Sequence, residues 1–187
     1  MKKIIYIISL FLITNLFAQE NDSTKSVISV SARALTPIGI FAENWNTGSA
    51  FYLGYGWIYS KEWGVQFQIG YNKYRLKTGS QYSESPKLSM LAFQIGGRHY
   101  FLDGIFKPYV IVLSGVNYIR LFYKSGDALI DERETHMNFQ IGTGFDFYII
   151  NNFQLEISAL YNSHLINPSI PYNLTGFEYG MGINWMF

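Results

Sequence analysis

A four-residue unit, Phe-Gln-Ile-Gly, occurs three times in the chain, at residues 67–70, 93–96 and 139–142. In each copy two large apolar side chains alternate with an amide and a glycine. Successive side chains of a β-strand point to opposite faces of the sheet, so each copy has one bulky apolar face and one small polar face. The repeated unit therefore predicts strands whose two faces meet different surroundings.

The same alternation continues along most of the chain. It is clearest over residues 51–59, 63–72, 137–147 and 153–161, where Phe, Tyr, Trp and Ile alternate with Gly, Gln and Asn. Most segments exceed the ~5–6 residues of a mean globular strand and match the ~9–11 that a tilted strand needs to cross a bilayer. We predict eight strands: 26–36, 48–59, 63–74, 88–101, 107–119, 135–148, 153–162 and 175–187.

The connections between these segments alternate in length. Those after the second, fourth and sixth strands are tight turns, with the sequences SKE, LDGIF and IINN. Those after the other strands are long and polar, and the third long loop is expected over residues 120–134. Short turns at one end and long loops at the other are typical of outer-membrane barrels. An even number of strands also returns both termini to the short-turn end.

The direction in which the apolar face points decides between two kinds of barrel. A soluble barrel would expose a glycine-rich face with few of the charges that keep sheets from pairing, and would crowd its core with aromatic rings. Aromatic residues make up 18% of the chain and charged residues only 14%. In a membrane barrel the apolar face meets lipid, the small polar face fills a narrow lumen, and closure leaves no unpaired backbone in hydrocarbon. We therefore predict an all-β fold, an eight-stranded antiparallel up-and-down transmembrane β-barrel, with a soluble periplasmic barrel as the alternative.

The N-terminus has the features of an export signal. Lys2 and Lys3 precede an apolar run over residues 4–13, and Ala18 is a small residue before the expected cut. We predict a cleaved signal peptide at residues 1–18, a short polar leader at 19–25 and the barrel at 26–187. The alternative is an uncleaved anchor, although the apolar run falls short of the ~20 residues of a spanning helix. The expected location is the cell outer membrane.

Composition excludes several classes of function. The formal net charge is +1, with no basic or acidic tail, so nucleic acid is not an expected partner. The absence of cysteine excludes disulfides and thiolate metal sites. His99, His136 and His164 fall in different segments without ligand spacing, and the acidic residues of the third long loop fit no calcium loop. We expect no catalytic residue, no metal and no cofactor.

Charged residues on the lumen face form the candidate site. The alternation places Arg33, Arg98, Glu156 and Glu178 inside. Arg33 and Glu178 belong to the first and last strands, which become neighbours when the barrel closes, and Arg98 and Glu156 can meet across the lumen nearer the short-turn end. Unpaired buried charges are costly, so we expect two pairs that plug the interior. An eight-stranded barrel is just wide enough for its own side chains, which favours a plug over a pore.

Aromatic residues near strand ends are expected to form the girdles at the two membrane interfaces. These residues are Trp57, Tyr59, Trp63, Tyr71, Tyr109 and Trp185.

The ending TGFEYGMGINWMF resembles the last strand of bacterial outer-membrane proteins, which finish in an aromatic residue preceded by alternating apolar positions. That resemblance implies an assembly signal read by the barrel-assembly machinery. Its positions are Phe177, Tyr179, Met181, Ile183, Trp185 and Phe187. The stretches LTPIGIFAENWNTGSAFYLGYGW and KPYVIVLSGV are similar to the first loop and the fifth strand of small OmpA/OmpX-type barrel domains, which belong to the porin-like family. The resemblance implies an architecture rather than an activity.

The expected role is non-enzymatic: envelope structure, or surface interaction through the long loops. The expected partners are outer-membrane lipid and the assembly machinery, and the expected state is a monomer. One alternative is a channel or transporter for small or hydrophobic molecules. The other is a lipid-modifying enzyme; lipid-A deacylases on similar barrels carry His and Ser two residues apart on one strand face, a spacing that this sequence lacks.

Overall fold

The computed structural model describes residues 24–77, 87–125, 128–150, 152–165 and 174–187, so the predicted signal peptide lies outside the described residues. The described chain forms eight strands and one short helix, α2 (Ile40–Asn44). The strands are β1 (Lys25–Pro37), β2 (Gly48–Ile58), β3 (Trp63–Arg75), β4 (Lys87–Tyr100), β5 (Phe106–Ser125), β6 (Ala128–Ile150), β7 (Phe153–Leu165) and β8 (Gly176–Met186). No helix among the described residues has the length and apolar character needed to cross a membrane.

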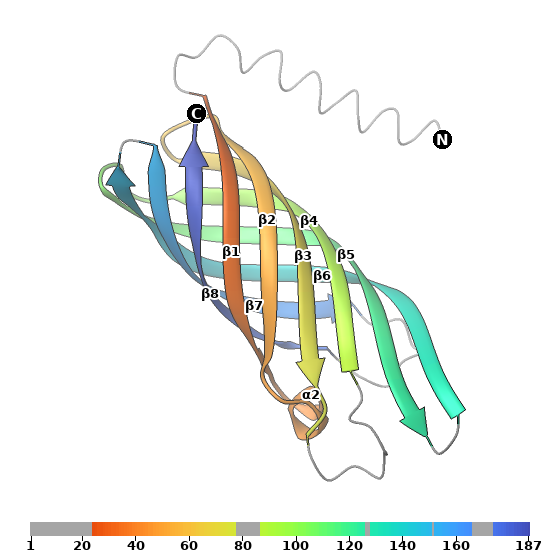
Figure 1. The fold of residues 1–187 in the computed structure, drawn as a ribbon. Coiled ribbons are helices and arrows are strands. Elements are labelled where there is room, and N and C mark those ends of the chain that lie inside the picture. The colour runs from red at the N-terminus through yellow and green to blue at the C-terminus, as the bar shows by residue number, and fades with distance from the viewer. Residues whose placement is uncertain (1–23, 78–86, 126–127, 151, 166–173) are drawn as a thin grey trace, which may run out of the picture.

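The strands close into one antiparallel barrel in sequence order, as Figure 1 shows. Closure comes from the pairing of β1 with β8, which runs from Val27 opposite Met186 to Pro37 opposite Gly176. Every strand thus has two hydrogen-bonded neighbours, which is the arrangement that a sheet surrounded by lipid requires. The predicted fold class, an eight-stranded antiparallel up-and-down barrel, is confirmed.

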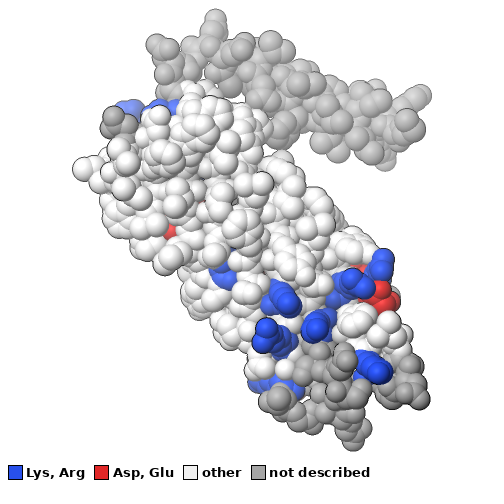
Figure 2. Space-filling model, in the orientation of Figure 1, with Lys and Arg blue, Asp and Glu red and all other residues white. Residues whose placement is uncertain are grey.

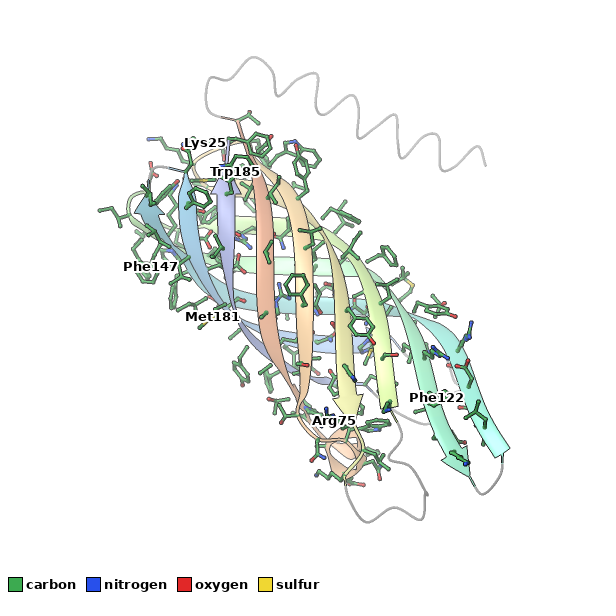
Figure 3. The ribbon with its side chains drawn as sticks, viewed as in Figure 1. Lys25, Arg75, Phe122, Phe147, Met181 and Trp185 are labelled. Carbon is green, nitrogen blue, oxygen red and sulfur yellow. The ribbon has the colours of Figure 1, made fainter. Side chains whose placement is uncertain are left out.

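The barrel is inside out relative to a soluble protein. In the repeated Phe-Gln-Ile-Gly unit the three phenylalanines are 37–38% exposed, whereas the three glutamines are at most 3% exposed. The residues are Phe67, Phe93 and Phe139 outside, and Gln68, Gln94 and Gln140 inside. Figure 3 shows the same arrangement for Phe147 and Met181, which point away from the sheet. The apolar surface therefore faces outward all along the wall, as in a membrane-spanning barrel.

The two ends of the barrel differ. Both ends of the described chain and the tight turns after β2, β4 and β6 lie at one end, called here the short-turn end (Figure 1). Helix α2 lies at the opposite end, called here the long-loop end. The tight turns after β2, β4 and β6 are at the predicted end of the barrel.

Most of the segment predicted to be the third long loop belongs to two strands instead. Residues 120–134 were expected to be a loop, but β5 continues to Ser125 and β6 begins at Ala128. The two strands stay paired through this region, with Arg120 opposite Arg133, and an ion pair joins Arg120 to Asp131 across it. The acidic residues of this region therefore lie on a two-stranded hairpin, which projects past the ends of β3 and β4 in Figure 1.

The predicted aromatic girdles need one further correction. Tyr59, Trp63, Tyr71 and Trp185 are 40–53% exposed on the outer wall. Tyr109 is fully buried instead and lies in the lumen. Strand β5 is apolar on both faces, so its alternation does not show which face is inward; its register against β4 and β6 decides this.

An arginine at Ile95 should lower the free energy of unfolding by about 2–4 kcal/mol, because the outer wall would then hold a charge in hydrocarbon. Ile95 is 44% exposed and lies in the middle of the apolar outer face of β4. The measurement is urea unfolding of the barrel in lipid vesicles. Thr135→Arg, on the outer face of β6 opposite Tyr118 and so at the edge of the apolar wall, is the control. Its cost should be about 0–1 kcal/mol, and equal costs at the two positions would contradict the inside-out wall.

Candidate functional site

The lumen is the candidate functional site, because the barrel buries its charged and amide side chains there. The first cluster joins Arg33 on β1 to Glu178 on β8, strands that are neighbours only because the barrel closes. Arg33 Nη1 donates to Glu178 Oε2 at 3.2 Å, and the residues are 5% and 1% exposed. Gly180 makes room for this pair, since a Cβ at that position would lie 2.4 Å from Arg33 Cγ.

Glu178 is satisfied by several donors besides the guanidinium. Its carboxylate accepts hydrogen bonds from Gln140 Nε2 at 2.7 Å, from Asn162 Nδ2 at 2.9 Å and from the Tyr52 hydroxyl at 3.3 Å. The Arg33 guanidinium lies 4.1 Å from the centre of the Tyr52 ring, a cation–π distance. A buried ion pair is stable only when such bonds replace its hydration, and this pair has them.

A run of side-chain hydrogen bonds starts at Arg33 and crosses to the far side of the lumen. Arg33 Nη2 donates to Gln68 Oε1 at 3.1 Å, and Gln68 Nε2 in turn donates to Gln94 Oε1. Gln94 Nε2 donates to Asn138 Oδ1 at 3.1 Å. Each amide thus accepts one bond and passes one on, from β1 through β3 and β4 to β6.

The run returns to its starting point and closes. Asn138 Nδ2 donates to Asn162 Oδ1 at 3.2 Å, and Asn162 Nδ2 donates to Glu178, the partner of Arg33. Arg33 can only donate hydrogen bonds and the Glu178 carboxylate can only accept them. These two residues therefore set the direction in which each amide of the run donates. We call this closed circuit the polar ring; its members are Arg33, Gln68, Gln94, Asn138, Asn162 and Glu178.

A second charged cluster lies nearer the short-turn end. Arg98 on β4 donates to Glu156 at 2.9 Å and to Asp146 at 3.0 Å. Its guanidinium lies 4.0 Å from the centre of the Tyr109 ring. Asn184 on β8 donates to both carboxylates, at 3.3 Å to Asp146 and 3.2 Å to Glu156. One arginine therefore holds two buried acids.

Asp146 and Lys107 are charged residues of the lumen that the sequence analysis does not include. The case of Asp146 is the clearer one. Asp146 is fully buried and shares an ion pair with Arg98. The signal was present, because Asp146 has the same parity along β6 as Asn138 and Gln140, which face the lumen.

The short-turn mouth of the lumen carries a third ionic group. Lys107 extends from the lumen, where its side chain is 11% exposed, and its Nζ lies 3.1 Å from Asp103. Lys61 lies 3.3 Å from the same carboxylate, and hydrogen bonds from the two lysines lower the pKa of Asp103. The Lys107 ammonium is 5.8 Å and 5.5 Å from the ring centres of Tyr100 and Tyr148. Aromatic rings and an ammonium group thus occupy this mouth.

A cluster of buried apolar side chains lies at the long-loop end of the lumen. Helix α2 places Phe41 inside, 1% exposed, with its ring 5.0 Å from that of Tyr74 and 6.2 Å from that of Trp45. The bridge between Trp45 and Leu76 fixes the end of the helix connection to the wall. The buried cluster comprises Leu35, Phe41, Trp45, Ala50, Tyr52, Tyr74, Leu88, Met90, Ala92, Ile119 and Leu174.

The three histidines lie in two separate places. The His99 ring packs on the outer wall, 4.5 Å from the ring of Trp63 and tilted against it by 43°. His136 and His164 both face the lumen, with ring centres 6.4 Å apart, and His136 Nε2 lies 2.8 Å from Glu134. No group of three or more metal-binding side chains occurs among the described residues.

The residues of the predicted assembly signal all lie on the outer wall. Their exposed fractions run from 39% to 62%. They are Phe177, Tyr179, Met181, Ile183, Trp185 and Phe187. Their recognition by the assembly machinery stays a prediction.

Comparisons with solved structures agree with this geometry. Neisserial surface protein A superposes with a TM-score of 0.62 at 15% identity, over 89% of this chain and 100% of that one. The chain has the fold of the eight-stranded outer-membrane barrels. A major outer-membrane protein of Thermus thermophilus gives a TM-score of 0.59 at 8% identity, over 88% of this chain and 100% of that one.

A third neighbour is Ail, the attachment invasion locus protein of Yersinia pestis, solved with the heparin analogue sucrose octasulfate. It has a TM-score of 0.54 at 14% identity, over 88% of this chain and 97% of that one. No family model and no curated protein matches the chain. At these identities the similarity to the outer-membrane barrels is one of fold.

Proposed function

We propose that this protein is a non-enzymatic integral outer-membrane barrel with a plugged lumen, which serves envelope structure or surface interaction through its long-loop end. The observation that carries the proposal is the polar ring, whose hydrogen bonds run from Arg33 around the lumen to Glu178 and back. The apolar cluster around Phe41 lies on one side of the ring, and the Arg98 cluster lies on the other. An eight-stranded barrel holds little more than its own side chains, so these layers leave no continuous polar path for ions.

The location follows from the outer wall. A closed barrel with an apolar exterior is one of only two backbone arrangements that satisfy all hydrogen bonds in lipid. The neighbours of known structure are outer-membrane proteins, which supports the same membrane for this chain. Export through a signal peptide at residues 1–18 and insertion by the barrel-assembly machinery complete the proposed route.

The surface role is supported by the long-loop end. The β5–β6 hairpin pairs as far as Ser125 opposite Ala128, three residues past Phe122, the last residue of β5 that pairs with β4. A paired hairpin holds its side chains in a fixed pattern, as a contact surface requires. One structural neighbour is named for attachment and invasion, which favours a similar surface role here.

Planar-bilayer recording tests the plugged lumen. We expect no steady single-channel steps from the pure protein, because the polar ring and the apolar cluster block the axis. A general porin inserted in the same bilayers is the positive control for detection. Regular steps from the pure protein would show an open lumen and would reject the proposal in favour of a channel.

A separate assay tests the proposal that the protein is not an enzyme. The protein is incubated with labelled lipopolysaccharide and phospholipid, and the products are weighed by mass spectrometry. We expect no turnover. Turnover that is lost in His99→Ala or His136→Ala would establish a lipid-modifying enzyme instead.

A second candidate function, passage of small hydrophobic molecules along the wall, is favoured by a groove on the lipid-facing side. The groove has a volume of about 420 Å³ and crosses β6, β7, β8 and β1. Its lining includes the small side chains of Ala32, Thr143 and Ala159 and the larger ones of Tyr179 and Met181. Ala159→Leu fills this space, so uptake of a labelled hydrophobic compound into vesicles should fall in that variant if the groove is used.

A further inference from the structure

The outer face of the barrel changes from apolar to basic toward the long-loop ends of β3, β4, β5 and β6. Figure 2 shows Lys and Arg gathered on this part of the surface, while the rest of the visible wall is almost free of charge. We call this surface the basic patch; its members are Lys73, Arg75, Lys87, Arg120 and Arg133, all exposed. The other four strands carry no Lys or Arg on the outer face of that half, among the described residues.

Strand register makes the patch continuous. Arg75 lies directly opposite Lys87, and Arg120 lies directly opposite Arg133. Ser89 on β4 is paired with Lys73 on one side and is opposite Arg120 on the other, so the two halves of the patch are joined. Like charges placed directly opposite each other destabilise a sheet, and here this happens twice.

The two halves of the patch differ in how their charges are balanced. Asp131 accepts two hydrogen bonds from Arg120, at 2.8 and 3.0 Å, and one from Arg133, at 2.8 Å. Lys73, Arg75 and Lys87 have no carboxylate within ion-pair distance among the described residues. Within the described part of the chain, the opposed pair Arg75–Lys87 therefore lacks the anion that the other pair has. Figure 3 shows Arg75 at the end of β3, pointing out from the barrel.

The position of the patch indicates which anion meets it. On β3 the outward residue just before Lys73 is Tyr71, 53% exposed, and on β5 the one just before Arg120 is Tyr118, 41% exposed. Tyrosines on a lipid-facing wall mark the level of the headgroups. The next outward residues therefore lie among the polar headgroups of the leaflet at the long-loop end.

We propose that the basic patch binds the phosphate groups of an anionic lipid in that leaflet, with Arg75 and Lys87 as the main phosphate ligands and Lys73 beside them. Arginine matches a phosphate with two parallel hydrogen bonds, and lysine adds a point charge. A phosphate between Arg75 and Lys87 offsets the repulsion between them. It balances their charge as Asp131 balances that of Arg120 and Arg133. The lipid class is a phosphorylated glycolipid or phospholipid with exposed phosphate oxygens. This binding is independent of whether the lumen conducts.

The test uses the purified full chain in a neutral detergent and lipid A with two phosphates as the probe. Bound lipid is counted by native mass spectrometry over a lipid titration. Arg75→Gln with Lys87→Gln should weaken binding about 30-fold, since each basic residue near a membrane surface contributes roughly fivefold. The unmodified protein should also prefer lipid A with two phosphates to lipid A with one, and its binding should weaken as salt is raised.

The matched control removes the same charge from the other end of the barrel. Lys25→Gln with Lys61→Gln changes two exposed lysines near the short-turn end, and this variant should bind lipid A as the unmodified protein does. Far-UV circular dichroism checks that both variants are folded barrels. Equal binding by the two double variants, or no dependence on the phosphates, would overturn the proposal. Binding of sucrose octasulfate without binding of lipid A would overturn it as well, and would make the patch a site for soluble polyanions.

Discussion

Replacing Arg98 by methionine should lower the free energy of unfolding of the barrel by about 3–5 kcal/mol. The change removes the cation from Asp146 and Glu156, which are 0% and 4% exposed and lie 3.0 and 2.9 Å from it. Two buried acids would then share one site without a counter-charge. Urea unfolding in lipid vesicles measures the loss.

The control for Arg98→Met removes the acids together with the arginine. Adding Asp146→Asn and Glu156→Gln leaves a neutral polar cluster of nearly the same shape, so most of the lost stability should return. The three-residue variant separates the cost of uncompensated charge from the cost of the smaller side chain. A single-variant loss under about 1 kcal/mol, no larger than an average substitution, would show that the cluster does not stabilise the barrel.

Replacing Glu178 by leucine should cost a similar amount, about 3–5 kcal/mol. Glu178 is the only acid of the polar ring, and its loss leaves Arg33 buried without a counter-charge. It also removes the acceptor of Gln140 and Asn162, whose amides would keep unsatisfied donors in the lumen. Because the pair joins β1 to β8, the variant should also refold into vesicles more slowly than the unmodified protein.

Two further variants test whether the loss of stability in Glu178→Leu comes from the unbalanced charge of Arg33. Arg33→Met combined with Glu178→Gln removes both charges but keeps an acceptor for the amides, and it should be more stable than Glu178→Leu alone. Glu62→Gln removes an exposed acid in the turn after β2 and should change stability by no more than about 0.5 kcal/mol. If Glu178→Leu costs as little as Glu62→Gln, the ion pair contributes nothing to closure of the barrel.

Much of the wall could be predicted from the sequence. The period of two over residues such as Phe67 and Gln68 reports directly on the two faces of a strand, because neighbouring side chains point in opposite directions. The same period assigns Arg33, Arg98, Glu156 and Glu178 to the lumen, and the structure places them in the two charged clusters.

Other features could not be read from the alternation. Strand β5 is apolar on both faces, so Tyr109 was placed at the membrane interface although it lies under Arg98. The hairpin beyond Arg120 and Arg133 has its apolar residues side by side rather than alternating with polar ones, so the sequence does not predict the strands that pair there. Helix α2, which brings Phe41 into the mouth of the lumen, has only five residues and shows no helical period.

Local alternation is enough to predict that the chain forms long two-faced strands and which side chains share a face. It does not predict which side chains meet inside the barrel. The partners of Arg33, Arg98 and the lumen amides depend on the stagger of all eight strands around the closed barrel, which no single segment contains. The polar ring exists only because six strands bring one side chain each to the same level of the lumen.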